Sequence, residues 1–404
     1  MGIFANPLTD LLEYEDFSRD FLKGTDPVGM TGCIDSEKVH FMSTFLGEKK
    51  VQLVVTYNEQ RAREIEEDYK LFCSQVYVIP PRDLIFFSAD LQGNAIIAER
   101  MKAFAALYQN EAKVIITTID ALMSAAVPFE QLMSHVIKLK EGDELDLEKL
   151  KHDLTVMGYE RVGRVEEPGQ FTVHGGIADV YPLTMEVPVR IELWGDEIDT
   201  IRCFEPQSQR SMDQIESVSV FPAAEVIADD TARRRAVGMI QNELESQLAV
   251  FKKVKEPDKV KRLREETNRI LEALGEEVVL EAPDSYINYF YPRTVRLSEY
   301  FDEKNTLVFL DEPMRLKERG DGVQAEFEES MKNRLEQGFL LPGQTALLTP
   351  AKHVLAAFER GQVAALSSLD SRLADFTVVN SYAVNVQNMN TYREGFELLI
   401  KDLT

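Results

Sequence analysis

The sequence predicts an α/β protein in which a parallel-sheet domain is interrupted by a smaller antiparallel α+β domain. Apolar, β-branched strands alternate with helical segments over residues 1–135, which is the pattern of a parallel sheet. Strands then dominate residues 136–222, and helices followed by apolar strands return over 223–390. An inserted unit explains this return better than three unrelated domains in a row. Residues 391–404 are expected to begin a following domain, so that the chain would be a fragment of a longer protein.

The first segment supplies buried strands and amphipathic helices in turn. Residues 51–57 are a continuous apolar run of the kind that a parallel sheet buries on both faces. A charged helix is expected over 58–72, a short strand over 76–80 and an amphipathic helix over 93–109. Residues 113–125 are expected to form a further strand that leads into a helix.

The second segment is expected to form hairpins. A strand, a charged turn and a helix are predicted within 136–162, and strands within 170–184, 187–206 and 217–225. The Trp-Gly-Asp-Glu stretch at 194–197 separates two strand runs and is typical of a hairpin turn.

The third segment begins with two long helices. They are predicted over 229–253 and 257–275, with a break at the proline that begins the second. A strand is expected over 306–310, a charged helix over 314–337 and a late strand over 376–380.

Charge is the outlying feature of the composition. The 404 residues include 45 Lys+Arg and 69 Asp+Glu, giving a formal net charge of −24, which argues against a whole-surface DNA-binding protein. The three scattered cysteines and isolated histidines offer no metal site or disulfide framework and fit a reducing cytoplasm. No apolar stretch of membrane-spanning length and no signal peptide is evident, so a cytoplasmic protein with no membrane partner is expected.

The α/β start of the chain contains only an incomplete phosphate-binding loop. Such a loop needs two glycines, a lysine for the phosphates and a hydroxyl for Mg²⁺. Residues 23–41 hold Gly29, Thr31, Gly32 and Lys38, but no reading frame supplies all the parts. Counted from Gly32, Lys38 falls into place, but the second glycine and the hydroxyl are missing. An ordinary turn before a helix is the simpler interpretation of these residues.

A second remnant lies at the end of the strand predicted over 306–310. Asp311 and Glu312 stand where a Walker-B acidic pair holds Mg²⁺. Without a phosphate-binding lysine, an acidic pair cannot build an ATPase. The two fragments together indicate a degenerate RecA- or helicase-like nucleotide-binding domain whose chemistry is lost.

Residues 158–211 carry the most informative pattern. They contain GYER, PGQFTVHGGIADVYP, PVRIELWGDEIDTIR and FEPQSQRS, and they resemble the signature shared by UvrB and the bacterial transcription-repair coupling factors. A looser similarity extends from about residue 30 to about 390. The resemblance implies a UvrB-like domain 1a over 1–135, domain 2 over 136–222 and domain 1b over 223–390.

Two departures from UvrB point to the coupling factors. The phosphate-binding loop is degenerate, and residues 79–100 are too few to hold the long DNA-clamping hairpin of UvrB. The chain is therefore similar to the N-terminal region of a coupling factor. This similarity implies that domains for RNA polymerase and DNA, and an ATP- and magnesium-dependent translocase motor, belong to the longer protein outside this chain.

The resemblance implies that the inserted domain binds UvrA. The positions that would face UvrA are Arg161, His174, Arg190 and Trp194. Family members usually carry arginine where this chain has His174. An imidazole carries little charge at pH 7, so this position is expected to contribute hydrogen bonding more than charge.

The residues themselves allow two interpretations of this surface. In VPVRIELW, Arg190 and Trp194 alternate with apolar residues and share a face, and an exposed tryptophan beside arginine is typical of a binding hot spot. Alternatively, Trp194 caps an apolar edge and Arg190 pairs with Glu192 or Asp196. A bulge expected at Gly175–Gly176 would turn the neighbouring histidine towards solvent.

The leading hypothesis is a non-enzymatic module, without cofactor or metal, that recruits UvrA to stalled RNA polymerase. A later domain is expected to cover Arg190 and Trp194 in the resting protein. One alternative is a divergent helicase-type ATPase in which Lys38 and Asp311–Glu312 still bind Mg-ATP. A second is a DNA-binding module that uses the basic residues at 161–164 and 233–235.

Overall fold

The fold was analysed in a computed structural model of the chain. It describes residues 13–47, 50–82, 91–275, 283–369 and 376–384, with Leu8 and Ile400. Residues 391–404, expected to begin a following domain, lie outside these residues except for Ile400, as do residues 83–90 within the segment 79–100 that was expected to be too short for a DNA clamp. Within the described part of the chain, no helix has the length and apolar character needed to cross a membrane.

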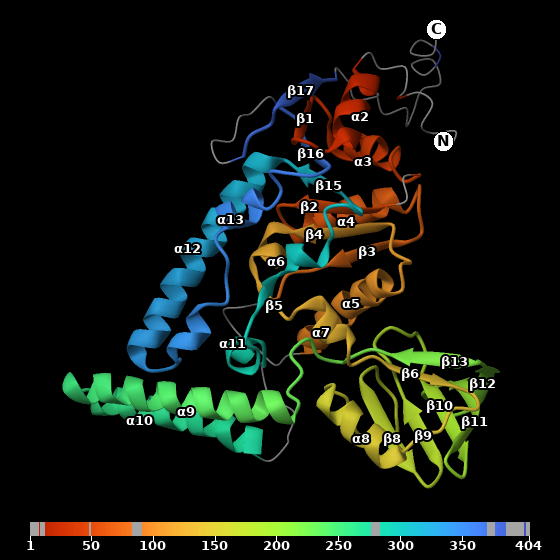
Figure 1. The fold of residues 1–404 in the computed structure, drawn as a ribbon, viewed down its shortest axis with the longest axis vertical. Coiled ribbons are helices and arrows are strands. Elements are labelled where there is room, and N and C mark those ends of the chain that lie inside the picture. Colours follow the sequence, from red (N-terminus) through yellow and green to blue (C-terminus); the bar gives the residue numbers. More distant parts are fainter. Residues whose placement is uncertain are drawn as a thin grey trace.

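A seven-stranded sheet forms the centre of the larger unit (Figure 1), and all of its paired strands run parallel. In spatial order its strands are β17 (Asn380–Ala383), β1 (Val28–Thr31), β16 (Val363–Ser367), β15 (Thr306–Asp311), β2 (Val51–Thr56), β4 (Val114–Thr118) and β3 (Val76–Ile79).

Helices cover both faces of this sheet, as parallel strands require. Side chains alternate along each strand, so that in β2 Val54 packs into one apolar core while Leu53 and Val55 pack into the other. The first core is covered by α2 (Tyr14–Lys23), α3 (Asp35–Ser43) and α4 (Glu59–Tyr69). The helices that contribute to the second core include α5 (Leu91–Tyr108), α6 (Ile119–Met123), α12 (Pro313–Gln337) and α13 (Ala351–Ala356).

Two long helices, α9 (Asp230–Lys253) and α10 (Pro257–Gly275), lie side by side and extend away from the sheet (Figure 1). Lys255 takes a left-handed backbone at φ 57° between them, and Pro257 begins the second helix, so the predicted break is confirmed. The remaining short elements are β5 (Ala125–Ala126), α7 (Phe129–Met133), η1 (Pro283–Tyr286), α11 (Ile287–Phe290), β14 (Val295–Arg296), η2 (Leu297–Tyr300) and η3 (Pro342–Thr345).

The late strand predicted over 376–380 is wrong in its position along the chain. Phe376 is buried in the core, and strand β17 begins only at Asn380, where it pairs with β1 at the edge of the sheet. The apolar residues that suggested a strand therefore serve as a packing segment, whereas the strand itself is short and largely exposed.

An antiparallel unit occupies one end of the long axis, beyond α5 and α7 (Figure 1). Its six-stranded sheet has the order β12 (Ser211–Gln214), β11 (Glu197–Phe204), β10 (Val189–Trp194), β9 (Ile177–Val180), β8 (Gln170–His174) and β7 (Glu160–Arg161). One face of this sheet packs against α8 (Leu147–Val156) and a two-stranded ribbon of β6 (Ile137–Lys140) and β13 (Ser217–Val220). The α/β class with a separate antiparallel sheet is confirmed, while the domain boundaries stay predictions.

Turns in the antiparallel sheet differ in part from expectation. The predicted turn between β10 and β11 is confirmed, with Gly195 at φ 66°. The bulge expected at Gly175–Gly176 is wrong, because these residues form the two-residue turn of the β8–β9 hairpin, with Gly175 at φ 59°. The turn pairs His174 with Ile177, so Ile177 lies on the outer face of the sheet and is 40% exposed beside the histidine.

A buried ion-pair cluster lies where the chain returns from the antiparallel unit to the larger one. Arg100 of α5 binds Glu225, which follows β13, through a bidentate contact whose Nη2–Oε2 distance is 3.0 Å. Arg82 lies 3.7 Å from the same carboxylate and also binds Asp284. Arg100 and Glu225 are 1% and 4% exposed, so each charge depends on its partner.

We expect Glu225→Ala to lower the free energy of unfolding by about 3–5 kcal/mol, because it leaves two buried guanidinium groups with one carboxylate. Chemical denaturation followed by circular dichroism would measure the change. Glu186→Ala is the control, because Glu186 forms a surface ion pair with Lys102 of α5. This substitution should cost less than about 1 kcal/mol. Equal effects of the two substitutions would contradict a special role for the buried cluster.

Candidate docking face and nucleotide-site remnant

The six-stranded sheet has one covered face and one outer face. We call the outer face of β8–β11 the docking face; it carries His174, Ile177, Arg190, Glu192 and Trp194. The strand register sets this composition, because Arg190 lies opposite Asp179 on β9, and Glu192 lies opposite Ile177. Residues between them, such as Ile191, point into the core of the unit.

Trp194 is the most exposed large apolar side chain among the described residues. It ends β10 opposite Glu197 and is 84% exposed. At that exposure it covers little apolar surface of its own sheet, which disfavours the interpretation as an edge cap. An aromatic side chain held by a hairpin and surrounded by water is suited to insertion into a partner.

Arg190 is held in a fixed orientation. Its Nε and Nη2 donate to the two oxygens of Asp179, both at 2.8 Å, and its guanidinium lies 4.8 Å from the ring centre of Phe204. The hydrogen bonds to Asp179 raise the pKa of Arg190. The alternative partners expected from the sequence, Glu192 and Asp196, are wrong, because the carboxylate directly across the strand pair is nearer.

Arg161 is separated from the other three predicted residues. It lies exposed on the edge strand β7, in register with Phe171, whose side chain is in the core. The register therefore places Arg161 on the opposite face of the sheet from His174 and Arg190. The structure gathers His174, Arg190 and Trp194 on one face and leaves Arg161 outside that group.

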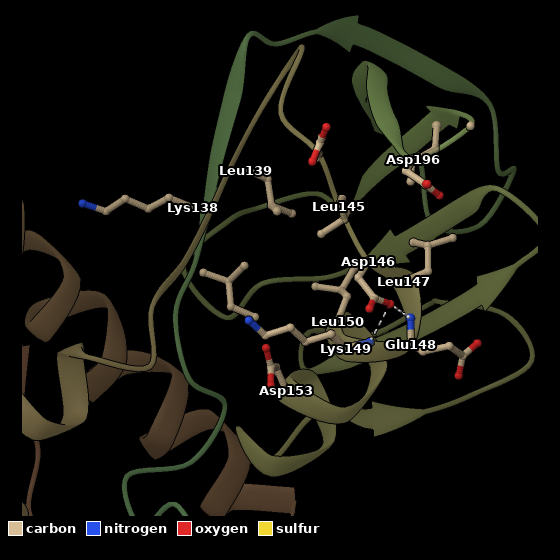
Figure 2. Close-up of a pocket in the computed structure, with 14 residues that line it drawn as sticks. Lys138, Leu139, Leu145, Asp146, Leu147, Glu148, Lys149, Leu150, Asp153 and Asp196 are labelled. Carbon is tan, nitrogen blue, oxygen red and sulfur yellow. Dashed lines mark hydrogen bonds between the residues drawn. The ribbon is translucent and has the colours of Figure 1, made fainter.

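A hollow of about 840 Å³ lies beside the β10–β11 turn, of which Asp196 is labelled (Figure 2). Its walls come from β6, the start of α8 and the β10–β11 turn. Asp146 projects among these residues but caps α8, accepting hydrogen bonds from the backbone nitrogens of Glu148 and Lys149 at 2.9 and 3.1 Å. This carboxylate is therefore committed to its own helix.

The remnant of the phosphate loop lies between β1 and α3 and is closed by the chain itself. A side chain at Gly29 would come within 2.9 Å of Val378, and Thr31 donates from its hydroxyl to the carbonyl of Tyr382 at 3.3 Å. Gly32 has φ 85°, and the carbonyl oxygen of Val384 lies 1.9 Å from the position of a Cβ there. A carbonyl acceptor thus faces the loop where a phosphate would need donors.

Lys38 lies inside the protein and binds both acidic residues of the remnant. Its Nζ is 2.7 Å from Asp311 and 2.6 Å from Glu312, and the lysine is 2% exposed. Asp311 also accepts from Thr56 at 2.8 Å and from Arg61 at 3.3 Å. The carboxylates that would face a magnesium ion in a working ATPase are here neutralised by two cations of the chain.

Glu312 completes this network from a strained position. Its backbone is left-handed at φ 53°, and its carboxylate accepts from the backbone nitrogen of Ser368 at 2.8 Å as well as from Lys38. Burial would raise the pKa of Glu312, but the hydrogen bonds from Lys38 and Ser368 outweigh it and lower the pKa. The network therefore holds the group ionised.

The fold and the two sites define a UvrB-like module without an intact phosphate loop. Residues 137–225 match the family described as the UvrB interaction domain.

The chain as a whole is similar to transcription-repair coupling factors. It is 30% identical over 342 residues to that of Bacillus subtilis (strain 168), covering 83% of this chain and 29% of the relative. It is 29% identical over 350 residues to that of Staphylococcus epidermidis (strain ATCC 12228 / FDA PCI 1200), covering 85% of this chain and 29% of the relative. To that of Staphylococcus haemolyticus (strain JCSC1435) it is 30% identical over 334 residues, covering 81% of this chain and 28% of the relative.

The chain is thus homologous to part of the transcription-repair coupling factors, and the resemblance seen in the sequence is confirmed. It spans 28–29% of the length of these curated relatives.

We expect Lys38→Met to destabilise the protein by about 3–5 kcal/mol at pH 7, because it removes one partner from a buried ion-pair network. A carboxylate with a lowered pKa stabilises the fold above its unfolded pKa, and this contribution is lost as pH falls through the folded value. The difference between wild type and variant should therefore be largest near neutrality and shrink below about pH 4.5.

Urea denaturation at several pH values would measure this difference. Lys70→Met is the matched control, since Lys70 pairs with Glu66 and Glu67 on the surface of α4. A difference for Lys38→Met that does not shrink as the pH falls below about 4.5, through the lowered folded pKa of Glu312, would contradict the assigned electrostatic role.

Proposed function

We propose that this chain is the UvrA-docking module of a transcription-repair coupling factor. The observation that carries the proposal is the match of residues 137–225 to the UvrB interaction domain, together with the exposed Trp194 on that same unit. In this role the chain recruits UvrA to RNA polymerase that has stalled on damaged DNA. Contacts to the polymerase and to DNA would come from other parts of the longer protein.

The geometry of the docking face supports such a role. Trp194 offers a large apolar anchor at the end of β10, and His174 and Ile177 offer a second exposed site on β8 and β9. Arg190 is held by Asp179 on the next row of the same face, further from the β10–β11 turn. A preorganised arginine loses little freedom on binding, which favours affinity. A partner carboxylate that contacts Arg190 would form a charge-assisted hydrogen bond, which weakens as salt rises.

The inserted domain is acidic overall, so its arginines can attract a partner only through local contacts. Residues 136–222 hold 9 Lys+Arg and 18 Asp+Glu, a net charge of −9. An acidic domain of this kind gives little attraction for nucleic acid, which disfavours the DNA-binding alternative. The basic cluster at the start of α9 is also engaged in part: Arg233 donates to the carbonyls of Ala228 and Leu274, and Arg234 to that of Asp230.

We further propose that the module performs no catalysis and needs no cofactor or metal. The arrangement of Lys38 against Asp311 and Glu312 supports this, because an internal ammonium satisfies the carboxylates that a nucleotide-bound magnesium ion would need. ATP and magnesium would serve only the translocase motor of the longer protein. Masking of Arg190 and Trp194 by a later domain, in a cytoplasmic bacterial protein, completes the proposal.

The docking proposal predicts that Trp194→Ala and Arg190→Ala each weaken binding to UvrA by about thirtyfold or more, the scale of an interface hot spot. Calorimetric titration of this chain with purified UvrA would measure the affinity. Leu71→Ala is the control, since Leu71 is 77% exposed in the larger unit. Absence of binding by the wild-type chain at tens of micromolar UvrA would refute the proposal.

The loss of nucleotide chemistry predicts that Mg-ATP at about millimolar concentration neither binds nor raises the melting temperature, since a bound ligand would stabilise the fold by mass action. Differential scanning calorimetry with and without Mg-ATP would test this. A rise in melting temperature that disappears in Asp311→Asn would instead support the divergent ATPase.

A further inference from the structure

A second arginine on the docking face has no partner to match its charge. Arg202 of β11 lies directly opposite Arg190 of β10, and the row across the sheet runs Thr172, Asp179, Arg190, Arg202. Residues paired in this way bring their Cβ atoms within about 5 Å, and like charges directly opposite each other are destabilising. This row therefore holds two cations and one carboxylate.

The single carboxylate is already fully used. Both oxygens of Asp179 accept from Arg190, and this aspartate is itself 6% exposed. Arg202 forms no ion pair with any of the residues that the structure describes. Its Nε is buried and has no hydrogen-bond partner among the described residues. A buried guanidinium nitrogen left without an acceptor is costly, so its persistence calls for an explanation.

The neighbouring side chains of Glu192 and Gln214 do not supply this acceptor. Glu192, on the same face, accepts from the hydroxyl of Thr200 at 3.2 Å. Gln214, which faces Arg202 from β12, donates its amide to Glu141 at 2.8 Å. Arg202 is thus half-buried, its Nε has no acceptor among the described residues, and it lies opposite Arg190 in the strand pair.

We propose that Arg202 is an additional docking residue that, together with Arg190, receives a carboxylate of the partner. This inference rests on the proposed docking of UvrA and assigns to that partner an acidic side chain seated between the two arginines. Arginine is suited to this task because its planar fork donates two parallel hydrogen bonds to a carboxylate. The incoming negative charge also removes the repulsion between the two cations, so that binding relieves a conflict present in the free protein.

The test combines affinity with stability. Arg202→Gln should weaken binding of the 404-residue chain to purified UvrA by about ten- to a hundredfold, the value of a charge-assisted hydrogen bond. The salt dependence of the remaining affinity should become shallower. The melting temperature of the free chain should stay unchanged or rise, because the substitution removes like-charge repulsion; a merely structural arginine would lower it.

Two further variants make the result specific. Arg202→Lys keeps the charge without the fork and should recover only part of the affinity. Arg210→Gln is the matched control, since Arg210 lies exposed in the connection between β11 and β12 and should bind as wild type does.

The outcomes separate this inference from the docking proposal. If Arg202→Gln binds UvrA as tightly as wild type while Trp194→Ala does not, Arg202 has no docking role and the docking face stands. The same conclusion follows if Arg202→Gln lowers the melting temperature without changing the affinity. If the wild-type chain fails to bind UvrA, the proposed function itself is wrong.

Discussion

Burial of Asp311 at the end of a central strand constrains the larger unit. A carboxylate that is 1% exposed must be compensated, and here Lys38 from α3, Arg61 from α4 and Thr56 at the end of β2 supply the compensation. The network therefore ties together the carboxyl ends of neighbouring parallel strands, where α/β proteins commonly bind ligands. The contacts of this network lie within the chain, so it acts as part of the scaffold.

The two sheets differ in how many faces they bury, and this difference determines where a partner has access. The parallel sheet is covered by helices on both faces, so its side chains are taken up by the two cores. The antiparallel sheet buries one face against α8 and the β6–β13 ribbon. Its other face is covered only in part, by the cluster of Val165, Tyr181 and Phe204, and leaves His174 and Trp194 exposed. The cluster of Arg100, Glu225 and Arg82 lies where the chain returns to the larger unit and does not use the docking face.

Sequence patterns predicted elements with a strong local signal. The apolar run of β2, the charged helix α4, the two long helices and the turn at Gly195 all follow from local periodicity and turn chemistry. Strands β1 and β16 were missed because they are short, and because the residues around β1 were examined for a phosphate loop.

Contacts between distant residues could not be predicted in the same way. Lys38 and Asp311 are 273 positions apart, and only the parallel order of the strands brings them together. The sequence-based partners of Arg190 came from its own strand and turn, because local patterns do not show the register between β9 and β10. That register, which the connection over 181–188 sets, places Asp179 opposite Arg190.

The two ionic clusters of the chain differ in how far their charges are paired. Around Asp311 the cations and carboxylates satisfy one another. On the docking face Arg190 and Arg202 lie opposite each other, and one carboxylate, that of Asp179, lies opposite Arg190 on the next strand, β9. A folded protein gains stability by neutralising such an excess charge, and many substitutions at Arg202 would do so. Retention of an unmatched cation beside an oriented arginine and an exposed tryptophan is therefore better explained by a partner that supplies the missing carboxylate than by the stability of the free chain.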